Sequence, residues 1–159
     1  MKDQITLERI KTIHPALVAE LTEIYTKICD ALSSDTFCRF THTFRSFAQQ
    51  NELYAKGRSK PGRKVTNAKA GQSFHNYGLA VDIALIKNGQ ALWDRGSDFD
   101  GDKIPDWMEV VKIFESHGWE WGGRWKSFPD YPHFQKTFGK QTSKLQFASK
   151  IPGTTYPIL

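Results

Sequence analysis

Two of the five histidines lie in segments that favour a metal site. His75 belongs to the segment Ser73–Asp82, in which small residues follow the histidine and Asp82 stands inside a strongly apolar run. A buried aspartate is costly unless it is paired or bound to a cation. Downstream, Pro132 disfavours a helix and His133 opens a short strand. Two imidazoles and a carboxylate suit zinc, and three protein ligands leave a fourth position for water, as in catalytic sites. We therefore predict that one catalytic zinc ion binds His75, Asp82 and His133.

Hydrolysis at such a site also needs a general base and a group that neutralises negative charge on the substrate. Asp130 lies three residues before His133 and is the natural base, although an aspartate before Tyr-Pro is also typical of a turn. Arg45 lies beside Ser46, where a guanidinium could hold a substrate carboxylate through two hydrogen bonds. A surface salt bridge is the alternative for Arg45.

The other three histidines favour structural roles. His14 precedes Pro15 at the entrance of a helix, and His117 lies in the last turn of another, where a positive charge suits the helix dipole. His42 shares a strand face with two phenylalanines and is expected in the core.

These residues are positioned by a mixture of short helices and strands. Apolar residues three or four apart, capping pairs at Ser46/Gln49 and Asp106/Glu109, and an Asn88-Gly89 hairpin signal define the elements. We expect helices over 15–32, 46–57 and 106–117, and strands over 36–44, 79–86, 90–93 and 133–138. The fold class is therefore α+β, with helices flanking a small, mainly antiparallel sheet.

Two motifs together carry a resemblance to a known family. Ser-x-His-x-x-Gly-x-Ala-x-Asp over 73–82, followed by Asp-x-Pro-His over 130–133, resembles the LAS zinc peptidases. That group includes VanY-type D-alanyl-D-alanine carboxypeptidases and the L-alanyl-D-glutamate endopeptidases of phage endolysins and bacterial wall hydrolases. The likeness covers roughly 6–138 and is strongest to the second subgroup, through four further segments: 7–17, 44–49, 57–66 and 121–135.

The resemblance implies both a fold and an activity. The fold would be like that of the hedgehog and D-Ala-D-Ala peptidase domains, with a zinc peptidase domain over 1–138. The activity would be hydrolysis of the L-alanyl-D-glutamate bond in peptidoglycan stem peptides, for lysis or remodelling of the cell wall. A D-alanyl-D-alanine carboxypeptidase and a non-catalytic wall-binding module of the same fold are the alternatives.

The resemblance also assigns roles to single residues. His75, Asp82 and His133 would be the zinc ligands, and Asp130 the base that activates water. Arg45, Gln49 and Ser73 would bind substrate, with Arg45 also part of the catalytic machinery. Arg124 departs from the pattern, because relatives often carry an acid there; this would alter substrate preference near the cleft.

Composition narrows the class of protein further. The chain has 159 residues, enough for one domain of this kind, and 22 basic against 17 acidic residues give a net charge of +5. Residues 56–69 contribute six positive charges and no acid, and the tail 139–159 is also basic. We expect this charge to capture an anionic wall polymer. A nucleic-acid-binding function is disfavoured because it would leave the His-Asp-His set unexplained. Two cysteines are too few for a disulfide framework.

The sequence also bears on location and assembly. Acidic residues at Asp3 and Glu8 occupy the place of the apolar stretch of a secretory signal, and no apolar run is long enough to span a membrane. We expect a monomer made in the cytoplasm without a signal peptide, which reaches the wall by another route such as release through a holin.

An acidic stretch follows the hairpin. Asp98, Asp100, Asp102 and Asp106 alternate like the oxygen ligands of a calcium loop. Lys103 stands where an EF-hand loop has its turn glycine, and we expect no bidentate glutamate to close the loop. A solvated loop that caps the next helix is therefore favoured over calcium binding.

Overall fold

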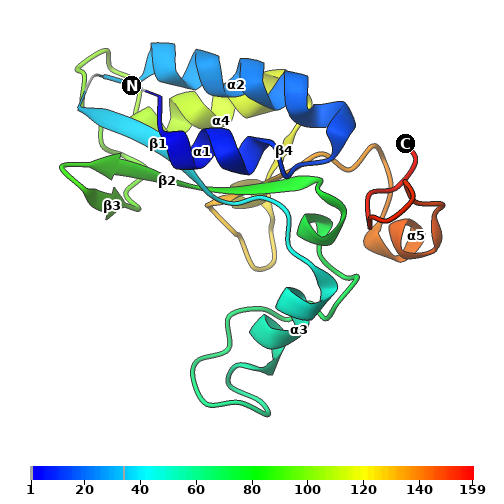
Figure 1. Cartoon of the computed structure of the whole chain (residues 1–159). Helices are drawn as coiled ribbons and strands as arrows, with labels where there is room; N and C mark the ends of the chain where they lie inside the picture. The colour runs from blue at the N-terminus through cyan, green and yellow to red at the C-terminus, as the bar shows by residue number, and fades with distance from the viewer. Residues whose placement is uncertain (1, 34) are drawn as a thin grey trace.

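The computed structural model describes residues 2–33 and 35–159 and shows an α+β fold (Figure 1). The helices are α1 (Gln4–Ile10), α2 (Val18–Ala31), α3 (Phe47–Ala55), α4 (Asp106–Ser116) and α5 (Thr142–Phe147). The strands are β1 (Thr36–His42), β2 (Ala80–Lys87), β3 (Gln90–Leu92), β4 (Glu120–Trp121) and β5 (His133–Gln135). Three short 3-10 turns, η1 (Pro15–Leu17), η2 (Phe74–Tyr77) and η3 (Gly122–Arg124), join them.

The strands form one antiparallel sheet in the order β1-β2-β5-β4, with β3 paired to β2. The hairpin between β2 and β3 turns at Asn88 and Gly89, whose φ values of 52° and 75° are those of the tight turn that the sequence predicts. The predicted α+β class with a small antiparallel sheet is confirmed.

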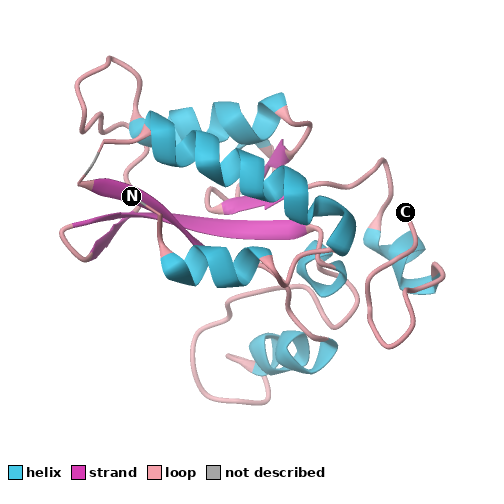
Figure 2. Cartoon of the chain, turned by 45° about the horizontal axis from the view of Figure 1, so that its top comes forward, coloured by secondary structure: helices cyan, strands magenta, loops and turns pink. Residues whose placement is uncertain are grey.

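Helices α2 and α4 lie side by side over one face of the sheet (Figures 1 and 2). Leu21, Ile24 and Ile28 of α2 are fully buried, and Phe114 of α4 stacks on Phe134 of β5 with ring centroids 4.2 Å apart. Burial of this apolar surface is the main force that holds the helices on the sheet. The sheet is thereby fixed as a rigid platform for the residues on its other face.

Strand β2 presents different residues to its two faces. Val81, Ile83 and Leu85 belong to the core beneath the helices. Since side chains alternate along a strand, Asp82 points to the opposite face. This explains how an aspartate stands inside an apolar strand without entering the core.

The expectation that His42 lies in the core is wrong. The register of β1 against β2 shifts between Phe40 and His42, so that His42 faces Asp82 while Phe40 remains fully buried. A bulge of this kind inserts a residue and re-aims the side chains beyond it. The strand also ends at His42 rather than at Phe44, and the His42 side chain is 60% exposed.

The start of α4 also differs from expectation. Its N-cap residue is Pro105, and Asp106 does not cap the helix but accepts a hydrogen bond from the Phe99 amide at 2.8 Å. Glu109 likewise forms no capping box there. The Asp106 carboxylate, expected to cap this helix, therefore binds the loop that precedes it instead.

Segment 139–159 lies against the rest of the chain. Leu145 of α5 is fully buried, His14 Nε2 lies 2.7 Å from the Pro157 carbonyl, and the Tyr156 hydroxyl donates to the Thr12 carbonyl at 2.7 Å. His14 thus has the structural role that the sequence predicts.

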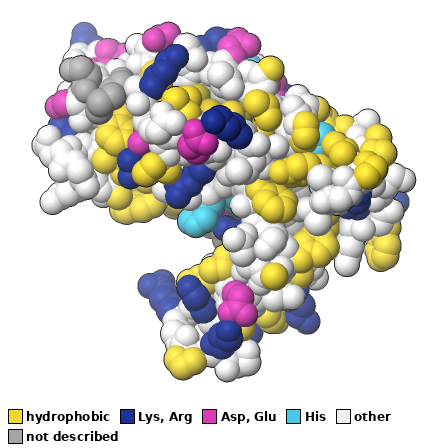
Figure 3. All heavy atoms as spheres, viewed as in Figure 1, with side chains coloured by type: hydrophobic (Ala, Val, Ile, Leu, Met, Phe, Trp, Pro, Cys, Tyr) yellow, Lys and Arg dark blue, Asp and Glu magenta, His cyan; other side chains and the backbone are white. Residues whose placement is uncertain are grey.

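Helix α3 and the loop after it form a lobe below the sheet (Figure 1). In the space-filling view a hollow separates this lobe from the body of the molecule, and Lys and Arg side chains gather on the lobe (Figure 3). Among the described residues no helix is both long and apolar enough to cross a membrane.

Candidate metal centre

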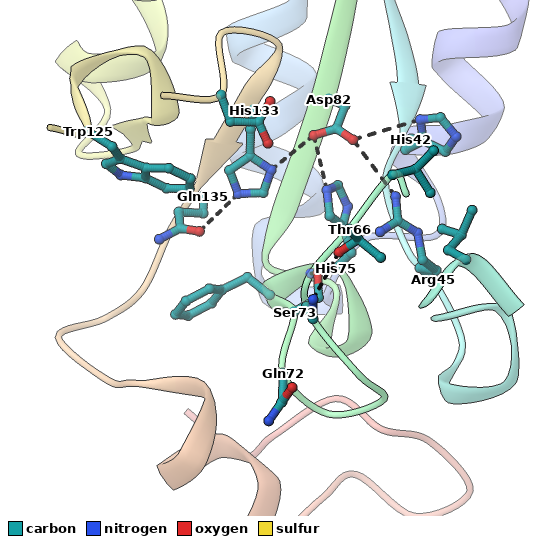
Figure 4. Close-up of a pocket in the computed structure, with 15 residues that line it drawn as sticks. His42, Arg45, Thr66, Gln72, Ser73, His75, Asp82, Trp125, His133 and Gln135 are labelled. Atoms are coloured by element: carbon teal, nitrogen blue, oxygen red, sulfur yellow. Dashed lines mark hydrogen bonds and ion pairs between the residues drawn. The ribbon is translucent and has the colours of Figure 1, made fainter. Parts of the chain in front are cut away.

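His75, Asp82 and His133 meet on the face of the sheet that the helices leave uncovered (Figure 4). Asp82 Oδ1 lies 3.1 Å from His75 Nε2 and 2.9 Å from His133 Nδ1. One ligand atom from each residue lies within 4.8 Å of the other two, close enough for all three to contact one ion. The structure thus brings together the ligands that the sequence predicts.

Both histidines are held in the orientation that a metal ligand needs. His75 Nδ1 lies 2.6 Å from the Thr43 carbonyl, and His133 Nε2 lies 2.9 Å from Gln135 Oε1. These oxygens can accept the proton of one ring nitrogen, which would leave the nitrogen that faces Asp82 free to bind a cation. Such outer hydrogen bonds are typical of metal-binding histidines.

The electrostatics of the group favour a cation. Burial alone would raise the pKa of Asp82, but the charges and hydrogen bonds of His75 and His133 hold that pKa well below its ordinary value. Burial alone would lower the pKa of His133, but the hydrogen bond and charge of Asp82 raise it above its ordinary value. The carboxylate is therefore ionised, and the two imidazoles stabilise its negative charge. A bound cation would stabilise that charge directly.

Short local motifs set these side chains in place. Ser73 and Asn76 form a capping box at the start of η2, in which each side chain accepts a hydrogen bond from the backbone on the other side of the box. This fixes the turn that carries His75. Gly78 then ends the turn with a φ of 66°, and an added Cβ atom would lie 2.6 Å from the His14 amide nitrogen. Only glycine fits this approach. Strand β2 begins two residues later, and its antiparallel register sets Asp82 opposite His133.

The three residues line a cavity of about 410 Å³. Arg45, Ser73 and Asp130 line the same cavity, as does Trp125. Its wall on the lobe side comes from Leu53 of α3 and from the loop residues Val65, Thr66 and Ala68. The hollow between body and lobe is therefore the pocket that holds the predicted site.

Arg45 reaches the centre from the chain between β1 and α3. Its Nη2 lies 3.9 Å from Asp82 Oδ2, and its Nη1 donates to Gln50 Oε1 at 3.1 Å. The guanidinium is mostly buried, and burial lowers the pKa of Arg45. Arg45 is thus an inward-facing cation rather than a partner in a surface salt bridge.

Asp130 is placed by the turn after η3. Its amide donates to the Gly122 carbonyl at 3.0 Å, and its own carbonyl accepts from the His133 amide at 3.2 Å. Partial burial raises the pKa of the Asp130 carboxyl above its ordinary value. A carboxylate with a raised pKa is a better proton acceptor, as a general base requires.

Two residues that the resemblance singles out lie elsewhere. Gln49 is outside this cavity, and its side-chain oxygen accepts from the Ser46 amide at 2.9 Å in the capping box of α3. Arg124 is exposed and pairs with Glu115 on α4, at 2.8 Å from Nη2 to Oε2. The structure gives neither side chain a position in the pocket.

Other residues of the site were not predicted from the sequence. His42 lies on the rim with Nδ1 3.8 Å from Asp82 Oδ2, and Gln135 orients His133 while donating to Glu120 Oε2 at 3.1 Å. In contrast, His117 has the structural role that the sequence predicts, since its Nδ1 lies 2.9 Å from the Ile113 carbonyl at the end of α4.

A His-Asp-His group and a nearby carboxylate in one pocket are the kind of side-chain set found in metal-dependent hydrolases. The sequence model of a peptidase M15 family described as D-alanyl-D-alanine carboxypeptidase matches residues 66–136. Residues 66–136 therefore match an M15-family peptidase domain, and the resemblance stated from the motifs is confirmed.

Named relatives agree with this assignment. The chain is 52% identical over 96 residues to the peptidoglycan L-alanyl-D-glutamate endopeptidase CwlK of Bacillus subtilis (strain 168), a match that covers 60% of this chain and 58% of CwlK. It is 35% identical over 80 residues to the L-alanyl-D-glutamate peptidase of Listeria phage A118, with 45% of this chain and 26% of the relative covered. The chain thus spans between a quarter and three fifths of the length of these relatives.

A solved structure extends the likeness to most of the chain. The crystal structure of the Serratia marcescens L-Ala D-Glu endopeptidase ChiX matches with a TM-score of 0.56 and 27% sequence identity, over 85% of this chain and 88% of ChiX. The likeness therefore reaches well beyond residues 66–136.

Proposed function

We propose that this protein is a zinc-dependent peptidoglycan peptidase that hydrolyses the L-alanyl-D-glutamate bond of stem peptides. The observation that carries the proposal is the meeting of His75, Asp82 and His133 in one pocket with Asp130 and Arg45. The names of CwlK, the phage A118 peptidase and ChiX support the choice of bond.

The donor set fits zinc. Two imidazole nitrogens, each backed by an acceptor oxygen, and one carboxylate make the three-ligand set of a catalytic zinc site. When bound, zinc would supply a Lewis acid for the scissile carbonyl and an acidified water molecule.

The residues of the chain supply the rest of the chemistry. Asp130 accepts the proton of the attacking water and later delivers it to the leaving amine, a role suited to its raised pKa. In the stem peptide the D-glutamate is linked through its side chain, so its α-carboxylate stays free. Arg45 binds this carboxylate and sets the register of the substrate in the pocket.

Two variants separate metal binding from proton transfer. His133→Ala removes a zinc ligand and should abolish both stoichiometric zinc binding and wall digestion. The helices should still pack on the sheet in this variant. Asp130→Asn should keep one zinc per chain and lose activity by about 10²- to 10⁴-fold, because only the base is removed. Zinc content is measured by atomic emission, and activity by release of peptides from purified walls.

Two results would contradict the proposal. One is full activity after complete removal of zinc by chelation. The other is an Asp130→Asn variant as active as the wild type.

The products distinguish the proposed bond from the alternative one. An L-alanyl-D-glutamate peptidase creates new glutamyl amino termini, whereas a D-alanyl-D-alanine carboxypeptidase releases free D-alanine. The carboxypeptidase is the second candidate because the family model carries that description. Mass analysis of muropeptides decides between them, and absence of turnover in the zinc-loaded protein would instead favour a wall-binding module. Action on the wall, with release through a holin or another route, stays a prediction.

A further inference from the structure

A second cluster of carboxylates lies apart from the pocket, in the loop between β3 and α4. Three acidic residues of this loop and two of the first turn of α4 turn toward one another. Single oxygens of Asp98, Asp100 and Asp106 lie within 4.8 Å of each other, and so do those of Asp100, Asp102 and Glu109. Because Asp100 belongs to both groups, the five side chains form one continuous set.

Asp106 is the residue that sets this cluster apart from an ordinary acidic loop. Its side chain is fully buried, with 0% exposure. Oδ1 accepts from the Phe99 amide, but Oδ2 is buried without a hydrogen-bond partner. Glu109 Oε2 is also buried without one. A buried, unpaired carboxylate oxygen costs free energy, so such a group calls for a cation.

The spacing of the five residues is that of a calcium loop. Counted from Asp98, the acids occupy positions 1, 3, 5, 9 and 12, with Ile104 at position 7. An EF-hand loop takes side-chain ligands from positions 1, 3, 5 and 9, a backbone carbonyl from position 7, and a bidentate glutamate from position 12. Glu109 is that twelfth residue, so the expectation that no glutamate closes the loop is wrong.

Lys103 occupies position 6, where an EF-hand loop has glycine. The residue adopts the required left-handed conformation nonetheless, with a φ of 77°. At this one position the backbone therefore has the conformation that a calcium loop needs, in spite of the lysine, whose conformation is strained and whose charge opposes a cation.

We propose that residues 98–109 bind one Ca²⁺ ion through the carboxylates of Asp98, Asp100, Asp102, Asp106 and Glu109. An all-oxygen set with five carboxylates suits calcium, which takes six to eight oxygen ligands in flexible geometry. Zinc is disfavoured because these side chains offer no nitrogen or sulfur donor, and Mg²⁺ is disfavoured because it prefers fewer protein carboxylates.

The charge of the cluster agrees with this assignment. Burial and the neighbouring Asp102, Asp100, Asp106 and Asp98 raise the pKa of Glu109 to about 7. The carboxylates thus repel one another when no cation lies between them. A divalent ion would turn this repulsion into attraction.

The ion would stabilise the body of the protein rather than take part in peptide hydrolysis. Asp106 and Glu109 lie in the first turn of α4, which continues into the buried residues Val110, Val111 and Phe114. Binding would fix the start of the helix that covers the sheet. The proposal is therefore independent of the peptidase activity, and its tests need no turnover.

Calcium titration of the full chain, loaded with zinc and freed of calcium, tests the proposal. We expect calorimetry to show one Ca²⁺ per chain. The unfolding temperature should rise by roughly 5 °C when calcium exceeds its dissociation constant a hundredfold. Asp100→Asn and Glu109→Gln should each weaken binding about tenfold or more. Asp30→Asn, the same change on an exposed aspartate of α2, should bind calcium as the wild type does.

Lys103→Gly provides a test in the opposite direction. Glycine removes both the strained conformation and the opposing charge, so this variant should bind calcium several-fold more tightly than the wild type. The proposal is overturned if millimolar calcium gives neither heat nor a shift in the wild type. It also fails if Mg²⁺ gives the same shift, or if Asp100→Asn and Glu109→Gln bind calcium undiminished.

Discussion

Arg45 combines a fixed charge with a fixed direction. Gln50 holds one side of its guanidinium at 3.1 Å, and Asp82 lies 3.9 Å from the other, so the planar group cannot rotate freely in the pocket. A lysine would keep the charge but would have neither the two-pronged geometry nor the contact with Gln50. This matters if Arg45 binds the free carboxylate of the substrate.

Replacement of Arg45 by lysine should therefore act on substrate binding. We expect Arg45→Lys to raise KM for a soluble stem peptide by about ten- to a hundredfold, with zinc content unchanged. Steady-state kinetics on that peptide measure the effect. Arg39→Lys is the control, since Arg39 pairs with Asp3 outside the pocket. An unchanged KM in Arg45→Lys would remove Arg45 from the substrate site.

Single residues differ in how far the sequence reveals them. His75, Asp82 and His133 could be identified because few side chains bind zinc and because a carboxylate inside an apolar strand demands a partner. Thr43 could not, since it contributes a backbone carbonyl that every residue possesses. His42 could not either, because its direction depends on a bulge that strand alternation does not foresee.

At the scale of elements, an ion pair helps to join α1 to the sheet. Asp3 caps α1 by accepting from the Thr6 amide at 3.0 Å, and Arg39 of β1 donates to both oxygens of Asp3 at 2.8 and 3.1 Å. Burial alone would raise the pKa of Asp3, but the hydrogen bonds and charge of Arg39 and Thr6 lower it below its ordinary value. The ionised form of Asp3 thus stabilises the folded state.

This pair should make the stability of the protein depend on pH. A lowered pKa means that the contribution of Asp3 is fully present above the ordinary aspartate value and is lost as pH falls through the folded value. Asp3→Asn should lower the unfolding temperature of the zinc-free protein at pH 7, and the difference from wild type should shrink as pH falls below the ordinary aspartate pKa of 3.8. Asp30→Asn serves as control. A difference that stays constant with pH would contradict the role of the ion pair.

The turn between η3 and β5 has a different requirement. A Cβ atom on Gly122 would collide with the carbonyl oxygen of Asp130. Gly122→Ala should displace this turn and lower activity about tenfold or more, since small misplacements of a catalytic group are costly. Gly96→Ala is the matched control, because the only neighbouring atom there lies 3.7 Å from the added Cβ. Wild-type turnover by Gly122→Ala would show that the turn tolerates the shift.

Elements also differ in how well the sequence predicts them. Helices α2 and α4 and strand β2 were expected because their apolar periodicity is strong. Helix α1 was not, because it has only seven residues and few buried positions, and its stability comes from contacts with β1 rather than from its own sequence. The true cap of α4 was also missed, since Asp106 serves the loop instead of the helix.

At the scale of the whole molecule, charge is distributed unevenly around the pocket. The loop after α3 carries exposed Lys56, Lys60, Arg63, Lys64 and Lys69. Residues 65, 66 and 68 of the same loop form a wall of the pocket. The positive side chains gather on the lobe that borders the hollow (Figure 3). A basic surface beside the pocket would attract an anionic polymer and raise the local concentration of its stem peptides.

This arrangement predicts that salt affects two substrates differently. Digestion of intact walls should slow by about three- to tenfold between 50 and 500 mM salt, because screening weakens the attraction of the polymer to the loop. Hydrolysis of a short soluble stem peptide should change little. The double variant Arg63→Gln/Lys64→Gln should digest walls more slowly at low salt and depend less on salt, with its peptide kinetics intact. Lys2→Gln/Lys112→Gln removes the same charge from exposed positions outside the loop and should behave as the wild type. An equal salt dependence for walls and peptide, or equal effects of the two double variants, would mean that the positive charge of the loop does not recruit the wall.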